Sequence, residues 1–170
     1  MKCFSFIHQN ANHYSKSERG STLIESAALM LPFLLLFLGI VEFGWYFLHQ
    51  HTLQFSTREG MRMALVGSTL LDQNGDALSR EESIKKTIEN QARWAMNIEP
   101  EKIWIYQVGD NYSDPDDWKT SAANAGNPAD YMRVRVQYDH EFFTPLISGF
   151  FSSDQKVTMA AEGTYRNELF

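Results

Sequence analysis

The hydrophobic positions of this chain form one long run near the N-terminus, followed by shorter segments with helix-like and strand-like spacing. Between Ser26 and Val41, sixteen consecutive residues carry no charged side chain, and the stretch up to Leu48 is rich in aromatic residues. The segment from Leu23 to Leu48 has twenty-six residues, and as a helix it would be about 39 Å long. Because the hydrocarbon core of a bilayer is about 30 Å thick, this segment is long enough to span a membrane.

The same helix is predicted to continue beyond the apolar run. Residues 49–66 contain no proline and have Gly60 as their one helix-weakening residue, and their side chains follow a helical spacing. A helix over residues 23–66 would have forty-four residues and a length of about 66 Å. Gly67 then provides the stop signal.

The remainder of the chain shows the pattern of a small mixed domain. Ser79 and Glu82 are spaced as a capping box, and the apolar stripe that follows predicts a helix to about Met96. Alternating apolar residues predict three strands, at residues 103–108, 131–138 and 156–165, the last of them shorter or at the sheet edge. These elements predict an α+β fold: a transmembrane helix that continues into a head with a second helix and a small antiparallel sheet.

The composition of this head limits the classes of partner that it can bind. From Gly67 onward the chain has ten Lys and Arg against seventeen Asp and Glu, a net charge of −7, and the whole chain has a mean hydropathy of −0.35. Nucleic-acid binding depends on Lys and Arg that neutralise phosphates, so an acidic domain argues against it. The one cysteine, Cys3, excludes an intramolecular disulfide. It also precedes the apolar run, whereas the acylated cysteine of a lipoprotein would follow such a run.

Three interpretations compete for the N-terminal segment. A secretory signal peptide would need small residues after the apolar run, but Glu42 and a bulky aromatic stretch follow it. An uncleaved signal anchor would fit the length of the run, with Trp45 and Tyr46 at one interface and the preceding basic residues in the cytoplasm. The third interpretation keeps this topology and adds a cleavage between Gly20 and Ser21, ahead of the helix.

Cleavage after Gly20 would explain why a carboxylate opens the apolar run. An ionisable group inside a membrane is costly and marks a functional site by default. The new α-amino group of Ser21 would be largely protonated at neutral pH, and Glu25 lies four residues on, on the same helical face. Glu25 could offset that charge in its own chain or in a neighbouring chain. Alternatively, it is simply favourable at a helix N-terminus, where a negative charge gains about 0.3–1 kcal/mol from the helix dipole.

Six short elements between residues 19 and 66 are weak signals alone, but their order and spacing make a specific set. They are Arg19-Gly20, Ile24-Glu25-Ser26-Ala27-Ala28-Leu29, Leu31-Pro32, Leu34-Leu35-Leu36, Gly39-Ile40-Val41-Glu42-Phe43-Gly44 and Arg58-Glu59-Gly60-Met61-Arg62. This set resembles the TadE-like family, which comprises pseudopilins or minor pilins of the bacterial tight-adherence (Tad, or Flp type IVb) pilus system.

The resemblance implies a processing site and a role in assembly. It implies that a dedicated prepilin peptidase cuts between Gly20 and Ser21, which makes Glu25 the fifth residue of the mature chain and its assembly carboxylate. The family usually has an aromatic residue after this glutamate, whereas this chain has Ser26. The implied partners are the peptidase, other Flp/Tad pilins and pseudopilins, an inner-membrane pilus assembly platform and the lipid bilayer. No cofactor and no nucleic acid are expected.

Two further residues of the helix carry specific hypotheses. Pro32 predicts a kink, because proline in a membrane helix frees a carbonyl that neighbours must satisfy. The alternative is a role of Pro32 in extraction of the helix from the membrane. Glu42 lies seventeen residues beyond Glu25, about 25 Å along the helix axis. This places it at the periplasmic boundary, where a carboxylate is tolerated, and where it could also pair with a neighbouring subunit.

The polar segment 109–130 is a long connection without predicted secondary structure. Its acidic residues include Asp110, Asp114, Asp116 and Asp117, and Trp118 follows them. Oxygen ligands of this kind suit calcium, but a solvated surface loop is the favoured interpretation. Residues 72–76 imitate the start of an EF-hand loop, yet Ala77 and Ser83 replace its required Gly and Glu. No metal site is therefore predicted.

Catalytic motifs are absent from the sequence. His49 and His51 are two residues apart, so on a helix they would point to different faces, and His140 would follow the second strand. No P-loop, G-x-S-x-G element or Cys/His cluster is present. The sequence therefore predicts no enzyme.

The sequence as a whole predicts a single-pass inner-membrane protein with a cytoplasmic N-terminus and a periplasmic head. Its predicted parts are a cleaved leader (1–20), a transmembrane helix (21–48), a periplasmic continuation of that helix (49–66) and an α+β head (67–170). The expected function is that of a minor pilin or pseudopilin in assembly of a Flp pilus used for adhesion and biofilm formation. Such a subunit could itself enter the extracellular pilus. The alternative is an uncleaved, signal-anchored periplasmic binding or scaffold protein.

Overall fold

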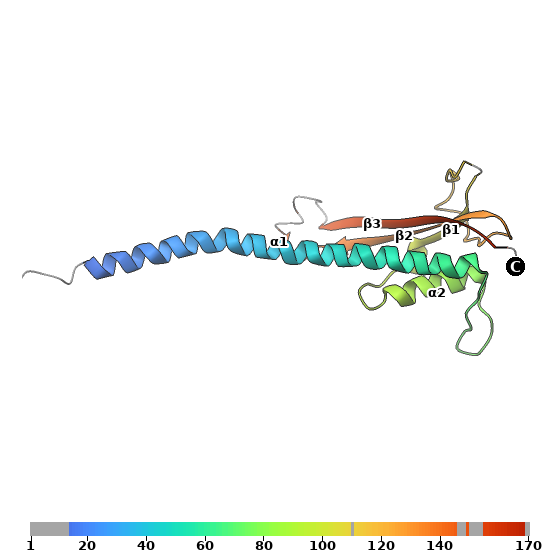
Figure 1. Ribbon diagram of the computed structural model, residues 1–170, viewed down its shortest axis with the longest axis horizontal. Coiled ribbons are helices and arrows are strands. Elements are labelled where there is room, and N and C mark those ends of the chain that lie inside the picture. The colour runs from blue at the N-terminus through green and yellow to red at the C-terminus, as the bar shows by residue number, and fades with distance from the viewer. Residues whose placement is uncertain (1–13, 110, 146–148, 150–154, 169–170) are drawn as a thin grey trace, which may run out of the picture. The chain divides into compact units, whose positions relative to one another are not determined.

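The computed structural model describes residues 14–109, 111–145, 149 and 155–168, with side chains from residue 20 onward (Figure 1). Residues 1–13, most of the predicted leader, lie outside the described residues. In chain order, the elements are helix α1 (Tyr14–Leu65), helix α2 (Arg80–Ala92), a 3-10 turn (Pro100–Lys102) and strands β1 (Ile103–Gln107), β2 (Tyr131–Glu141) and β3 (Lys156–Arg166). The predicted α+β fold is confirmed.

Two compact units make up the chain, residues 1–41 and residues 42–170, and α1 runs through the boundary between them. The second unit therefore includes the last part of α1 as well as the sheet and α2. The helix begins at Tyr14, not at the predicted Leu23. The polar stretch between these residues has no proline and only Gly20 as a weak helix former, so it can extend the helix.

The sheet has three antiparallel strands in the order β1-β2-β3. Ile105 of β1 lies opposite Val134 of the central strand β2, and Val134 lies opposite Gly163 of β3. β2 extends to Glu141, three residues past its predicted end, because it remains paired with β3. β3 is an edge strand as expected, but with eleven residues it is as long as β2 and not shorter.

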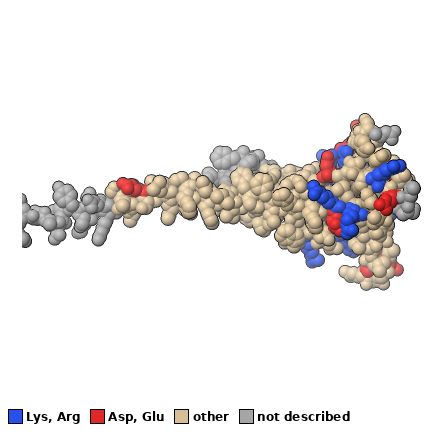
Figure 2. All heavy atoms as spheres, viewed as in Figure 1, with Lys and Arg blue, Asp and Glu red and all other residues tan. Residues whose placement is uncertain are grey.

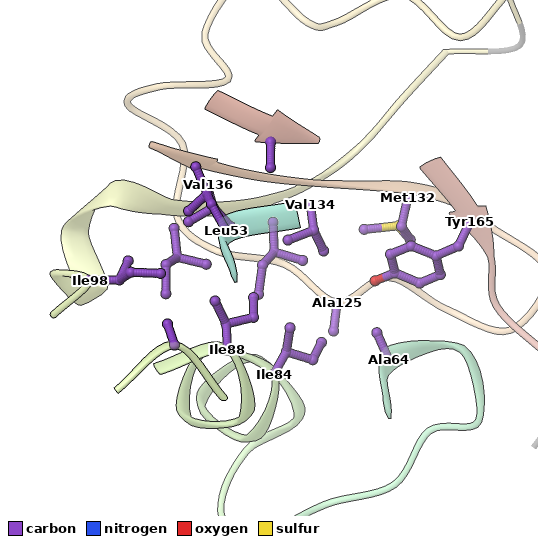
Figure 3. Close-up of a cluster of buried hydrophobic side chains, with 14 of the residues drawn as sticks. Leu53, Ala64, Ile84, Ile88, Ile98, Ala125, Met132, Val134, Val136 and Tyr165 are labelled. Atoms are coloured by element: carbon purple, nitrogen blue, oxygen red, sulfur yellow. The ribbon is translucent and has the colours of Figure 1, made fainter. Parts of the chain in front are cut away.

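The core of the second unit lies between the sheet and the two helices (Figure 3). Its fully buried side chains come from α1, α2 and all three strands, and include Leu53, Ile84, Ile88, Ile105, Val134 and Met159. The alternation predicted for β2 is present, since Met132, Val134 and Val136 face this core. The predicted capping box at Ser79 is also present, but α2 ends at Ala92 and not at Met96.

Gly60 makes a close contact between the two helices. A Cβ atom built on Gly60 would lie 2.4 Å from Cγ1 of Ile88, so only glycine lets α1 and α2 approach this closely. The next residue, Met61, lies against Gly163 of β3, where an added Cβ would be 2.4 Å from the Met61 sulfur. On the surface, Arg62 pairs with Glu59 at 2.5 Å. Gly60, taken from the sequence as a helix-weakening residue, is therefore a packing residue.

The C-terminal end of α1 is bound to the head by polar side chains. Arg80 donates hydrogen bonds to the carbonyls of Ala64 and Gly126, at 3.1 and 3.0 Å. Asn167, which is 3% exposed, donates to the carbonyls of Ala125 and Asn127. The last carbonyls of a helix lack partners within the helix, and the Ala64 carbonyl accepts from both Arg80 and the backbone N–H of Gly67. Gly67 has a φ of 68°, so the predicted stop at Gly67 is present.

Candidate functional site

The predicted processing junction lies inside α1, on its exposed surface. Gly20 and Ser21 are both exposed, and a Cβ atom at Gly20 would meet nothing within 4 Å. The Ser21 hydroxyl donates a 3.1 Å hydrogen bond to Oε1 of Glu25. The residues that the sequence grouped together thus lie one turn apart on one helical face. Their roles in processing and assembly stay predictions.

The helix surface that follows the junction is apolar and exposed. Side chains that would be buried in a soluble protein are open to the surroundings, with Leu23 exposed by 71%, Leu29 by 73% and Phe33 by 63%. Figure 2 shows that this part of the helix is almost free of charge, whereas Lys, Arg, Asp and Glu gather on the head. The helix is long and apolar enough to cross a membrane once.

Pro32 lies within α1, and the helix continues on both sides of it. Proline has no N–H group, so the carbonyl four residues earlier loses its usual helical partner. The kink predicted at this position, and a role in extraction from the membrane, stay predictions.

Glu42, which the sequence predicts at the periplasmic boundary, is buried in the second unit with 2% exposure. Its Oε1 accepts a hydrogen bond from the backbone N–H of Phe143, and its Oε2 accepts one of 3.2 Å from the Thr144 hydroxyl. Both donors belong to the connection that follows β2. This carboxylate therefore binds its own chain, about a hundred residues away in sequence. Its position at the periplasmic boundary stays a prediction.

Two buried histidines lie beside Glu42. The Nδ1 atoms of His49 and His140 are 2.9 Å apart, so one ring donates and the other accepts. Among the residues that the structure describes, the buried Nε2 atom of His140 has no hydrogen-bond partner. Burial lowers the pKa of His140, an effect that His49 strengthens and the Glu42 carboxylate opposes. Sequence reasoning missed this pair, although it correctly placed His49 and His51 on different helix faces: His49 is buried and His51 is exposed.

The segment after β1 is held against the outer face of the sheet by charge and aromatic contacts. The carboxylate of Asp114 forms ion pairs with Arg133 and Arg135 and accepts a 3.0 Å hydrogen bond from the Tyr106 hydroxyl. The Arg135 guanidinium lies over the Trp118 ring, with its central carbon 4.3 Å from the ring centre. Although burial alone would raise the pKa of Asp114, the Tyr106 hydrogen bond and the two arginine charges hold it below its ordinary value.

These contacts bear on the calcium hypothesis. Asp114 uses both carboxylate oxygens on arginines, and Asp110 lies outside the described residues. Asp72 accepts hydrogen bonds from the backbone N–H groups of Asn74 and Asp76, which closes a local turn. In the part of the chain that the structure describes, no three His, Cys, Asp or Glu side chains are grouped as metal ligands.

Comparison with known families gives one finding. Residues 20–62 match the family described as TadE-like protein. The resemblance to this family, predicted from residues 19–66, is confirmed over that range. The matched part contains Gly20, Glu25, Pro32 and Glu42 and ends at Arg62. No curated protein and no solved structure matches the chain significantly.

The TadE-like match indicates a function connected with the tight-adherence pilus and with its other components. It covers the exposed apolar surface of α1 and the part of the helix that packs on the head. It ends before α2 and the sheet, so it does not include the loop at residues 109–130 or the residues around His140.

Proposed function

We propose that this protein is a minor pilin or pseudopilin that is cleaved after Gly20 and takes part in assembly of a tight-adherence pilus for adhesion and biofilm formation. The observation that carries the proposal is the TadE-like match over a helix whose apolar side chains are exposed. A surface of that size must be covered, because exposed apolar area is unfavourable in water. Lipid would cover it before assembly, and the helices of neighbouring pilins would cover it afterwards.

Processing at Gly20 is compatible with the local structure. Glycine is less favourable in a helix interior than alanine by about 1 kcal/mol, so α1 is locally weak at the proposed cleavage site. A Cβ atom added at Gly20 would have no neighbouring atom within 4 Å, so the surface at this position is open. A prepilin peptidase could therefore unwind and bind this segment without disturbing the head.

Glu25 is the residue we propose to act in assembly. Its partner in the uncleaved chain is the Ser21 hydroxyl, four residues earlier. Cleavage would add a positively charged α-amino group to the same residue. The Glu25 carboxylate could then bind this group in its own chain or in a neighbouring subunit, which would offset two charges that are each costly in an apolar environment. No catalytic role is proposed for any residue.

The processing step is tested by the mass of the protein recovered from native membranes. The proposed cleavage removes residues 1–20, and the mature chain begins at Ser21. Gly20→Trp should leave the protein at full length, because a bulky residue would occupy the peptidase's small-residue position. Gly39→Trp is the matched control, since Gly39 also has open space around its Cβ, and this variant should be processed normally. Unchanged processing of Gly20→Trp would refute the assigned site.

The assembly step is tested with Glu25 variants in cells that carry the pilus system. Glu25→Ala should reduce piliation strongly while membrane insertion and processing continue, and Glu25→Asp should restore part of it. Pili would be counted by electron microscopy, and insertion would be followed by membrane fractionation. Normal piliation by Glu25→Ala would refute the assembly role. A wild-type protein that retains its first twenty residues and still functions would favour the uncleaved, signal-anchored binding or scaffold protein instead.

A further inference from the structure

We propose that Phe143, in the connection after β2, is a second membrane contact of this protein, inserted into the lipid interface beside α1. This inference rests on the membrane insertion of α1 that belongs to the proposed function. It concerns residues 142–145, which lie outside the matched family region. The partner surface is the outer, periplasm-facing leaflet of the bilayer that α1 spans.

The first step is the position of Phe143 along α1. The Glu42 carboxylate accepts hydrogen bonds from the Phe143 N–H and the Thr144 hydroxyl, which ties this connection to the helix at residue 42. A buried carboxylate that lost these donors would leave a costly unpaired charge, so the tie should persist in the membrane. Phe143 is thereby held at the level of Glu42.

The second step is the depth of that level. The apolar run of α1 continues for six residues beyond Glu42, to Leu48. At the α-helical rise, residue 42 therefore lies about 9 Å below the end of the run. If Leu48 marks the membrane boundary, Phe143 lies below that boundary and not above it. The connection must enter the interface because Glu42 holds it there.

The third step is the chemistry of the surface. Phe143 is 64% exposed, whereas the neighbouring Phe142 is 7% exposed and packs into the unit. The Phe143 ring lies 5.9 Å from the ring of Trp45, which is itself 37% exposed. Phe47 is a further exposed aromatic side chain at a similar level of α1, on a different face of the helix. Aromatic residues are favoured at membrane interfaces, so this group extends the aromatic belt predicted at Trp45 with a residue far away in sequence.

Charged residues lie on the strand side of this group. Glu141 and Lys156 form an exposed ion pair at the point where β2 ends and β3 begins. Charged side chains are costly in the hydrocarbon region, so this pair would mark the start of the aqueous phase. The polarity along the connection thus changes within two residues, from Glu141 to Phe143.

The proposal is tested with the full-length protein in phospholipid vesicles. Cys3→Ser removes the one native cysteine, and Phe143→Cys in that background is labelled with an environment-sensitive nitrobenzoxadiazole dye. Two matched sites carry the same dye: Trp94→Cys, exposed by 68% on the head, and Leu34→Cys in the middle of the apolar run. Quenching is measured with spin-labelled lipids in the bilayer and with iodide in the water.

The dye at position 143 should be quenched several-fold more by spin-labelled lipid than the dye at Trp94, and correspondingly less by iodide. The dye at Leu34 should be quenched by lipid most strongly. Equal iodide quenching at positions 143 and 94, with lipid quenching at position 34, would overturn the second contact and leave the membrane helix intact. An absence of lipid quenching at position 34 would instead refute the membrane insertion on which both proposals depend.

A second variant tests whether the hydrogen bonds of Glu42 hold Phe143 in the membrane interface. Glu42→Gln removes the charge of the carboxylate and weakens the tie to Phe143. In this variant the position-143 dye should show a measurable gain in iodide quenching, while the dye at Leu34 should be unchanged. If lipid quenching at position 143 persists unaltered in a folded Glu42→Gln protein, the anchoring role of Glu42 is wrong.

Discussion

Residues 20–41 and residues 42–65 belong to one continuous helix, but their side chains have opposite surroundings. In the first stretch large apolar side chains are exposed, among them Leu29 by 73% and Leu36 by 63%. In the second stretch several polar side chains are buried: Glu42, His49, Thr52, Ser56 and Thr57. From residue 42 on, polar side chains of the helix become buried, while some aromatic side chains, such as Phe47 and Phe55, stay exposed.

The difference shows where each stretch finds its partners. Polar groups can be buried in the second stretch because hydrogen bonds within the same unit satisfy them: the hydroxyls of Ser56 and Thr57 donate to the Leu53 carbonyl, and Glu42 accepts from the connection after β2. The apolar surface of the first stretch needs a partner from outside the chain, either lipid or other helices. The second stretch serves the fold, and we propose that the first stretch, together with residues 42–48, serves membrane insertion and assembly.

The largest expected effect comes from shortening one leucine in each stretch of the helix and comparing head stability. Leu53→Ala should destabilise the head by about 2–5 kcal/mol, because it opens a cavity in a tightly packed core. The matched change Leu34→Ala should leave head stability unchanged, since Leu34 is 46% exposed and lies in the other unit. Urea unfolding in detergent micelles, followed by the fluorescence of the head tryptophans, measures both. Equal effects of the two changes would contradict the division of the helix.

Alanine substitutions of two glycines of α1 test how closely the helix packs at each position. Gly60→Ala should destabilise the head by about 1–3 kcal/mol, because the new Cβ would overlap the Ile88 side chain. Gly44→Ala has open space and should be neutral or stabilising by up to about 1 kcal/mol, since alanine is the better helix former. The same unfolding assay applies. A stabilising Gly60→Ala would mean that the two helices do not pack as closely as the structure shows.

Substitutions of Glu25 and of Glu42 should have their effects in different assays. Glu42→Ala should destabilise the head by about 1–3 kcal/mol, because the Phe143 N–H and the Thr144 hydroxyl would lose their shared acceptor. Glu25→Ala should leave head stability unchanged and affect piliation instead. Unfolding measurements and pilus counts on both variants form a two-by-two comparison. A head destabilised by Glu25→Ala would show that the first stretch also serves the fold.

The smallest expected effect is a pH dependence of head stability that arises at His140, the β2 partner of His49 in the second stretch. Burial lowers the pKa of His140 from its ordinary value of 6.5, so below about pH 6.5 the unfolded chain binds a proton that the folded chain does not. Head stability should therefore be complete above this pH and decline as the pH falls below it. His140→Asn keeps a polar group at the Nδ1 position and should flatten the decline. Unfolding curves between pH 7.5 and pH 5 check this, and an equally steep decline in the variant would assign the effect elsewhere.

Much of the fold could be predicted because it depends on local periodicity. The apolar run, the capping box at Ser79 and the alternation of β2 are patterns over a few residues, and each corresponds to an observed element. The errors lie at the ends. α1 starts earlier than predicted, and α2 ends earlier, because propensity alone sets no sharp limit and packing decides which residues remain helical.

The candidate site was predictable only where its residues are near in sequence. Ser21 and Glu25 are four residues apart, and helical geometry alone predicts that they share a face. The bonds from Glu42 to Phe143 and from His49 to His140 cross about ninety to a hundred residues. No local signal indicates such a pair, since each of these residues occurs equally well on a surface.

By itself, the sequence determined that this chain has a helix long and apolar enough for a membrane, a carboxylate near its start, and a small antiparallel head. These properties follow from the order of apolar and charged residues and from the fixed rise of a helix. The tertiary structure alone decided that Glu42 is an internal hydrogen-bond acceptor, that Gly60 allows two helices to touch, and that Phe143 lies beside Trp45. Those facts depend on how distant segments pack, because close packing brings together residues that no spacing rule connects.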